Sequence, residues 1–169
     1  MTIHNSHPFM PPPEQRNPLR RLRGSLPAPV TIWTSSDGDR RDGWTISSLL
    51  VADGDPGEFV ALVNEDADWW DLFRETRKAT VNVLGQGQGW VSEVFARVAP
   101  SPGGPFRTGE WNDHEHGPRL TGAAAWAEVT LVDGDPAHAG WGLLVRATIE
   151  RIEFAGDIPA LQHLAGRYS

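Results

Sequence analysis

The sequence predicts a mainly β protein, an antiparallel barrel or sandwich with a few short helices. Apolar and polar residues alternate from Leu143 to Glu150, which is the two-residue period of a half-buried strand. Residues 36–43 hold an Asp-Gly turn between two apolar runs, and this pattern is typical of a β-hairpin. A length of 169 residues fits one compact domain.

The expected elements follow one another at short intervals. Residues 1–17 are rich in proline and lack apolar periodicity, so we expect an extended arm. Pro18 then begins a short helix over residues 18–23, because proline is well tolerated at the first helical position. We place the domain boundary between an arm of residues 1–21 and a domain of residues 22–169. Strands are expected at residues 30–34, 44–51, 59–63 and 80–84, and two long strands close the domain.

Two further helices are expected between the strands. Trp69, Leu72 and Phe73 have helical spacing, and Asp68 stands where an N-cap carboxylate would accept free amide hydrogens. Trp69 is therefore as compatible with the core as with a ligand site. The next helix is indicated by an apolar stripe of Val91, Val94, Phe95 and Val98. The glycines of residues 85–89 lack the GxGxxG spacing of a dinucleotide fingerprint, so they predict a loop.

The composition excludes several function classes. A formal net charge of −7 argues against nucleic acid or an anionic membrane as partner, because both are held mainly by Lys and Arg. No apolar run reaches membrane-spanning length, and residues 1–13 do not resemble a signal peptide. The absence of cysteine removes disulfides and thiolate metal sites and fits a reducing compartment. We expect a soluble, cytoplasmic protein.

A series of different short segments follows in a fixed order along residues 22–169. Each segment alone is a weak signal of family membership, but their order and spacing together are specific. The segments are residues 30–34, residues 44–48, Val63-Asn64, Asp71-Leu72, Arg74-Glu75, residues 79–84, Phe95, Phe106, Trp111, Pro118, residues 120–128 and Gly166-Arg167-Tyr168. In this series the chain resembles the flavin reductase-like, FMN-binding split-barrel family. The resemblance implies a six-stranded antiparallel Greek-key split barrel with short flanking helices, which forms a homodimer with the flavin at the subunit interface.

The resemblance also implies an activity. Family members transfer a hydride from NAD(P)H to FMN or FAD, and many pass the reduced flavin to a monooxygenase. Because both cofactors already carry the reacting atoms, the protein needs only to stack the rings and exclude water. This agrees with a sequence that offers no Ser-His-Asp or paired-carboxylate constellation, so we expect binding residues and no catalytic side chain.

The candidate cofactor residues match family positions one by one. On the family's cofactor-binding strand they are Trp44, Thr45, Ile46, Ser47 and Ser48. Hydroxyls there could hydrogen-bond a flavin ring edge and ribityl chain, or they could simply decorate an exposed strand. Asn64 matches a ring contact but is equally typical of a turn. Ala67 and Trp69 occupy the positions of the family's phosphate-binding Ser and Thr, and Arg167 and Tyr168 match a C-terminal segment that packs or contacts the flavin.

The phosphate-binding turn departs from the family pattern. Four carboxylates surround it: Glu65, Asp66, Asp68 and Asp71. They should repel a phosphate dianion, although they would equally stabilise the N-terminus of their own helix. Trp69 and Trp70 could cover a different ring system. Two alternatives therefore stay open: a non-catalytic split-barrel dimer that has lost its phosphate anchor, or a protein that uses another cofactor such as a deazaflavin or haem.

One segment has the residue types of a metal site. His114 and His116 are separated by one residue and flanked by Asp113 and Glu115, and such a group could bind zinc or nickel. In the family this segment is a loop near the interface. We therefore interpret it as a loop and expect no metal.

Overall fold

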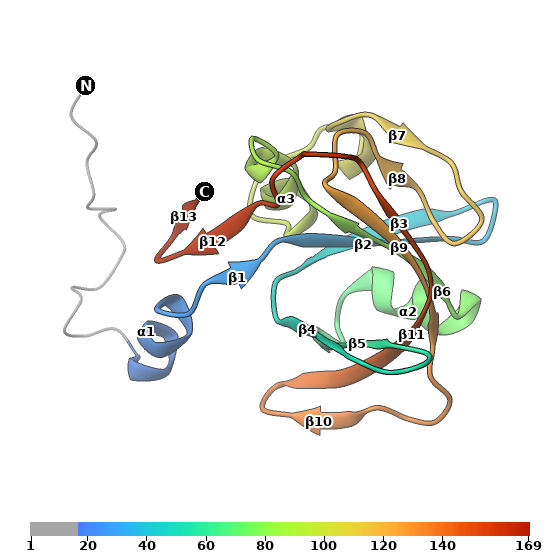
Figure 1. Ribbon diagram of the computed structural model, residues 1–169, viewed down its shortest axis with the longest axis horizontal. Coiled ribbons are helices and arrows are strands. Elements are labelled where there is room, and N and C mark those ends of the chain that lie inside the picture. The colour runs from blue at the N-terminus through green and yellow to red at the C-terminus, as the bar shows by residue number, and fades with distance from the viewer. Residues whose placement is uncertain (1–16) are drawn as a thin grey trace.

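The computed structural model describes residues 17–169, in which a curled antiparallel sheet forms a split barrel (Figure 1). The strands of this sheet are β2 (Thr31–Ser36), β3 (Arg41–Ile46), β4 (Leu49–Ala52), β5 (Glu58–Val63), β6 (Lys78–Val83), β9 (Ala125–Leu131), β10 (Ala137–Ala139) and β11 (Gly142–Phe154). The spatial order is β3-β2-β6-β9-β11-β5-β4, and β10 pairs with β11. The predicted mainly β barrel is confirmed.

The predicted strand at residues 44–51 is wrong as a single element, because it is divided at Ser47 and Ser48. β3 pairs with β2, whereas β4 pairs with β5 at the opposite end of the strand order. The amide of Leu62 in β5 donates to the carbonyl of Ser48 over 2.9 Å, so the junction itself is attached to the second wall. This division and the added β10 explain why the sheet has eight strands instead of the expected six.

The long strand β11 joins the two halves of the barrel. Its first part pairs with β5 and its second part with β9, and the register shifts between Ile149 and Arg151. The predicted alternation is confirmed, since Val145 and Ala147 are fully buried while Leu144 is 38% exposed. The outer face of β11 therefore carries an apolar side chain that no described element covers.

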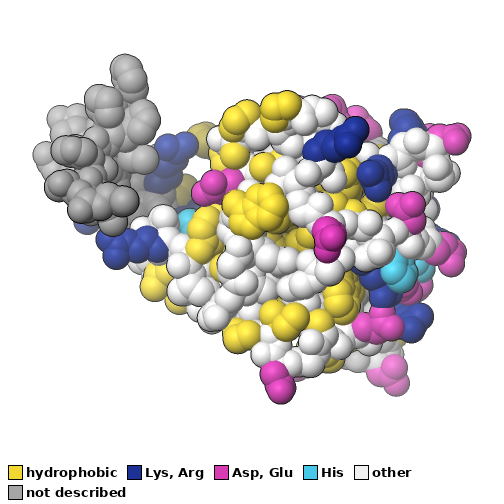
Figure 2. Space-filling model, turned by 90° about the horizontal axis from the view of Figure 1, so that it is seen from above, with side chains coloured by type: hydrophobic (Ala, Val, Ile, Leu, Met, Phe, Trp, Pro, Cys, Tyr) yellow, Lys and Arg dark blue, Asp and Glu magenta, His cyan; other side chains and the backbone are white. Residues whose placement is uncertain are grey.

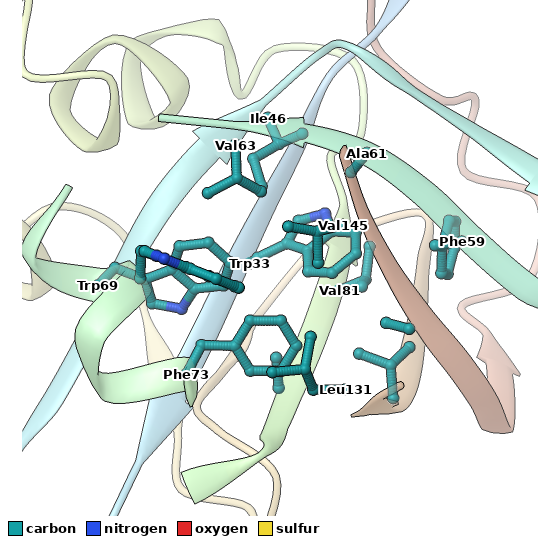
Figure 3. Packing of buried hydrophobic residues seen from close by; sticks show 14 of the residues in the cluster. Trp33, Ile46, Phe59, Ala61, Val63, Trp69, Phe73, Val81, Leu131 and Val145 are labelled. Atoms are coloured by element: carbon teal, nitrogen blue, oxygen red, sulfur yellow. The ribbon is translucent and has the colours of Figure 1, made fainter. Parts of the chain in front are cut away.

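The barrel core is aromatic, and helix α2 (Asp68–Thr76) supplies much of it (Figure 3). Trp69 and Phe73 stack with ring centroids 5.1 Å apart, and Trp33 from β2 meets both edge-on at 6.1 Å. The indole nitrogen of Trp69 donates to the hydroxyl of Ser35 over 3.2 Å. Trp69 is completely buried, so its role in this structure is packing.

The start of α2 differs from the prediction. Its N-cap is Ala67, which provides no side-chain cap, and Asp68 is the first helical residue. The preceding turn is held by Asn64, whose side-chain oxygen accepts the amide of Asp66 over 3.0 Å and whose carbonyl accepts the amide of Ala67. The predicted Asp68 cap is therefore wrong by one residue, and the turn before the helix is closed by Asn64.

A second apolar cluster lies under helix α3 (Gly89–Phe95). Phe95 packs against Phe106 and Trp111, with centroids 5.1 and 5.0 Å away. The connection that brings these rings together contains η2 (Pro105–Arg107) and a hairpin of β7 (Trp111–Asn112) and β8 (Arg119–Leu120). α3 ends before Val98, which is 76% exposed, so the predicted stripe continues one turn too far.

Both ends of the described chain form a small separate unit. Its elements are α1 (Pro18–Gly24), β1 (Ala28–Pro29), β12 (Gln162–Leu164) and β13 (Arg167–Tyr168). β1 pairs with β12, and β12 pairs with β13. The helix expected at residues 18–23 is confirmed. The extended arm predicted for residues 1–17 lies outside the described residues except for Asn17, whose side chain caps α1, and the boundary at residue 22 stays a prediction.

Among the residues considered for a metal site, Asp113, His114 and Glu115 line one surface depression, whereas His116 is separated from them. His116 is buried, and its Nε2 lies 3.2 Å from a carboxylate oxygen of Glu150, whereas His114 lines an open surface depression. Within residues 17–169, no group of three or more His, Cys, Asp or Glu side chains is arranged to hold a metal ion. Near His116, the Arg119 guanidinium donates hydrogen bonds to Glu128 and Glu153. The bond to Glu153 holds the pKa of that carboxyl below its ordinary value. The arrangement is that of a structural ion-pair network.

No helix in residues 17–169 combines the length and the apolar character needed to cross a membrane.

Candidate functional site

A cleft of about 500 Å³ opens beside the β3–β4 junction. Its walls come from α1, from the segment around β1, from the junction itself and from β12. The lining residues are Arg20, Arg23, Gly24, Leu26, Pro27, Ala28, Pro29, Ser47, Ser48, Leu49 and His163. This volume falls within the range of small-molecule sites, and the lining combines apolar surface with a few polar groups, as such sites usually do.

Pairing between the two ends of the described chain builds this cleft. Ala28 in β1 lies opposite His163 in β12, and the amide of Ala165 donates to the carbonyl of Gly24 over 2.9 Å. The hairpin of β12 and β13 thus fixes α1 beside the barrel. Arg20 and Arg23 are three residues apart on α1, so they share one face of that helix.

The predicted hydroxyl residues divide into two groups. The Thr45 hydroxyl is already used, because it donates to the carbonyl of Ser92 in α3 over 2.7 Å. The hydroxyls of Ser47 and Ser48 line the cleft, and no hydrogen bond within residues 17–169 uses them. Strand pairing in β3 ends at Ile46, and the chain turns there toward the second wall. The turn leaves both serine side chains available to a ligand.

Tyr168 is connected to the same region through α3. Its hydroxyl lies 3.4 Å from that of Ser92, and its ring centroid lies 5.1 Å from that of His163. Gly89 at the start of α3 permits this packing, since a side chain there would lie 2.8 Å from the Tyr168 ring. Ser92 therefore links Tyr168 to Thr45, and His163 links Tyr168 to the cleft that Ser47 and Ser48 line.

The other predicted site residues lie elsewhere. Ile46 points into the core, and Trp44 is half-buried beneath the guanidinium of Arg97, 5.4 Å from its ring centroid. Ala67 and Trp69 are 2% and 0% exposed, so their side chains offer no surface to a flavin. Two further predicted residues are exposed: Asn64, whose side-chain oxygen is used within its own turn, and Arg167 in β13.

Sequence reasoning missed the charged wall of the cleft. Arg20 and Arg23 line this wall from α1, and their spacing of three residues, which is visible in the sequence, places them on one helical face. For His163 no local signal exists, because its position depends on the pairing of β12 with β1. Long-range pairing of short strands is the information that a single sequence does not carry.

The described residues thus form an antiparallel split barrel with a ligand-sized cleft at a strand junction. Residues 23–169 match the family described as the flavin reductase like domain. This chain belongs to that family, which confirms the resemblance inferred from the ordered segments.

Individual relatives agree with this assignment. The chain is 31% identical over 143 residues to an NADPH-flavin oxidoreductase of Streptomyces viridifaciens, a match that covers 81% of this chain and 73% of the relative. It is 33% identical over 104 residues to the reductase component of an FADH(2)-dependent resorcinol hydroxylase of Rhizobium sp. (strain MTP-10005), which covers 60% of this chain. The chain spans 55% of the length of that relative and 64% of a 4-nitrophenol monooxygenase reductase component of Rhodococcus opacus.

Solved structures show the same fold. The NADH:FAD oxidoreductase SgcE6 of Streptomyces globisporus C-1027, in complex with NAD and FAD fragments, superposes with a TM-score of 0.80. The superposition covers 95% of this chain and 94% of that chain, at 22% sequence identity. At this identity the likeness concerns the fold alone.

The residues of the cleft fit a flavin. A flavin has a flat ring edged by hydrogen-bonding groups and a polar ribityl chain, and the cleft offers two unused hydroxyls, Ser47 and Ser48, beside the apolar side chain of Leu49. No carboxylate is among the lining residues. The cleft is therefore chemically suited to a flavin, whereas the acidic start of α2 is not suited to its phosphate.

Proposed function

We propose that this protein is an NAD(P)H-dependent flavin reductase that binds FMN, or alternatively FAD, in the cleft beside Ser47 and Ser48. The observation that carries the proposal is this cleft, with two uncommitted hydroxyls and no lining carboxylate, in a chain of the flavin reductase like family. The names of the relatives, which include an NADPH-flavin oxidoreductase, support the same activity.

When bound, the flavin supplies the hydride-accepting ring, so the protein contributes position and shielding. Ser47 and Ser48 would donate hydrogen bonds to the ring edge or ribityl chain, and Leu49 would cover part of the ring with apolar surface. The hairpin of β12 and β13 would limit the access of water from the side of α3. The proton that completes flavin reduction can come from water, so no side chain has to transfer it.

We further propose that the reduced flavin passes to a monooxygenase in the cytoplasm. The support is that relatives of this chain are named as reductase components of a resorcinol hydroxylase and a 4-nitrophenol monooxygenase. The absence of cysteine is consistent with a reducing compartment.

Flavin titration tests the proposed function. We expect FMN or FAD to bind at tens of micromolar or below, and NADH or NADPH to be oxidised when flavin is present. The double variant Ser47→Ala/Ser48→Ala should weaken flavin binding roughly tenfold, since it removes two hydrogen bonds. Ser36→Ala, at the distant end of β2, is the matched control and should bind as the wild type does.

If no flavin binds in that range and none supports nicotinamide oxidation, the reductase proposal is wrong. The same titration with a deazaflavin and with haem distinguishes the remaining cases. Binding of another cofactor would identify a different activity, and binding of none would indicate a barrel without catalysis.

We also propose that the protein is a homodimer, as the family resemblance implies. Support comes from an apolar patch, formed by Leu50, Leu62 and Leu144, on the outer face of β4, β5 and β11. These side chains are 58%, 42% and 38% exposed, and Leu62 lies directly opposite Leu144 in the sheet. Burial of such a patch against a second copy would remove it from water.

Leu62→Glu is expected to convert the dimer to a monomer in light-scattering measurements, because it buries a charge at the centre of the apolar patch. Val98→Glu is the control, since Val98 is 76% exposed and lies outside the sheet. A monomeric wild type would contradict the dimer, and a dimeric Leu62→Glu variant would exclude this face as its interface.

A further inference from the structure

We infer that Arg20 and Arg23 bind the phosphate group of the flavin nucleotide, in place of the phosphate site that the family resemblance puts at the start of α2. This inference rests on the proposed function, because it concerns the same cleft. It places the phosphate of the cofactor beside α1, and none of the site residues predicted from the sequence lies in that helix.

The first argument is the distribution of charge. In a chain with a net charge of −7, most arginines are neutralised by carboxylates. The paired arginines are Arg40, Arg41, Arg74, Arg77, Arg97, Arg119, Arg146 and Arg151. Within residues 17–169, no ion pair involves Arg20 or Arg23, and the nearby Arg167 is likewise outside these pairs. Figure 2 shows dark blue side chains at the end of the molecule where α1 lies, and also at the opposite end, where magenta Asp and Glu side chains lie among them.

The second argument is position. Arg20 and Arg23 line the same cleft as Ser47 and Ser48, and His163 lines its opposite wall on β12. A guanidinium presents a planar pair of donors that matches phosphate oxygens, so two arginines on one helical face form a favourable site for a dianion. A ligand whose ring lies against the serines can therefore have its phosphate beside α1.

The third argument is the unsuitability of α2. Its first turn carries Asp68 and Asp71, and the residues just before it include Glu65 and Asp66. Its cap residue, Ala67, provides no side-chain hydrogen bond and is 2% exposed. A phosphate there would meet several negative charges and no hydroxyl, which opposes binding. The free positive charge of α1 is the alternative that the structure offers.

Comparison of riboflavin with FMN tests the inference, because the two ligands differ only in the phosphate. We expect Arg20→Gln/Arg23→Gln to weaken FMN binding roughly ten- to a hundredfold and to leave riboflavin binding unchanged. Dissociation constants come from flavin fluorescence and calorimetry. The salt dependence of FMN binding should also become shallower in the variant.

Arg21→Gln is the matched control. Arg21 belongs to the same exposed helix and has the same charge, but it does not line the cleft. It should therefore retain wild-type affinity for FMN. Circular dichroism and the melting temperature of each variant establish that α1 and the barrel remain folded.

The outcomes separate the two proposals. If the wild type binds FMN and the double variant binds it equally well, the phosphate site on α1 is wrong while the reductase remains. A parallel loss of riboflavin binding would also overturn it, because the arginines would then shape the cleft without contacting the phosphate. A change confined to the KM for NADPH would assign the arginines to the nicotinamide nucleotide instead. Failure of the wild type to bind any flavin overturns the proposed function and this site together.

Discussion

Trp69→Ala is expected to lower the free energy of unfolding by about 3–5 kcal/mol, the usual cost of truncating a large buried aromatic side chain. Trp69 is completely buried, stacks on Phe73 and meets Trp33 edge-on. Its removal would leave a cavity in the middle of the barrel core and the hydroxyl of Ser35 without its indole donor. Denaturant unfolding, followed by circular dichroism, measures the change.

Trp141→Ala is the matched control, since Trp141 is 101% exposed and its loss should change stability by less than about 0.5 kcal/mol. The pair also tests the position of Trp69 relative to the cofactor. If Trp69→Ala abolished flavin binding in a protein of unchanged stability, Trp69 would belong to the ligand site and its buried placement would be wrong.

Gly117→Ala is expected to destabilise the protein by roughly 2–5 kcal/mol, through backbone strain and overpacking together. Gly117 has φ +149°, and a Cβ at this position would lie 2.2 Å from the carbonyl oxygen of Thr34. The loop cannot move away easily, because the Gly117 carbonyl accepts the Thr80 hydroxyl over 2.9 Å and the Pro118 carbonyl accepts the Thr34 hydroxyl over 2.6 Å.

Gly140→Ala separates the two contributions. Gly140 also has a positive φ, of +59°, but nothing lies within 4 Å of an added Cβ. This control should lose only about 1–2 kcal/mol, which is the strain of a left-handed backbone. Thermal melts of both variants give the comparison. Equal losses would show that the loop at Gly117 relaxes and that its close approach to β2 is not required.

Elements with strong local patterns could be predicted from the sequence. The alternation in β11 and the helical spacing of Trp69 and Phe73 have a direct local cause, and both predictions are confirmed. The division of the strand at residues 44–51 could not be predicted this way. Ser47 and Ser48 are compatible with a continuous strand, and only pairing with β5, which follows later in the chain, separates β4 from β3.

The candidate site could be predicted only in part. Ser47 and Ser48 line the cleft, because their place on the family's strand is a local feature, and their contact with a flavin stays a prediction. Ala67 and Trp69 match family positions only by their order in the sequence. In the structure both side chains are buried, so they offer no surface to a flavin. Arg20 and His163 come from opposite ends of the described chain, so their proximity follows from tertiary pairing and not from local sequence.

The arginines that form no ion pair are distributed unevenly over the described part of the molecule. Ion pairs neutralise most arginines of the barrel, whereas the arginines of α1 and β13 form no ion pair within residues 17–169. An anionic molecule that approaches a protein of charge −7 is repelled overall, and the arginines of α1 would attract it at close range. This attraction would orient the anionic molecule before it contacts the protein. Salt screens charges separated by more than about 10 Å at 0.1 M, so added salt would weaken the long-range attraction first.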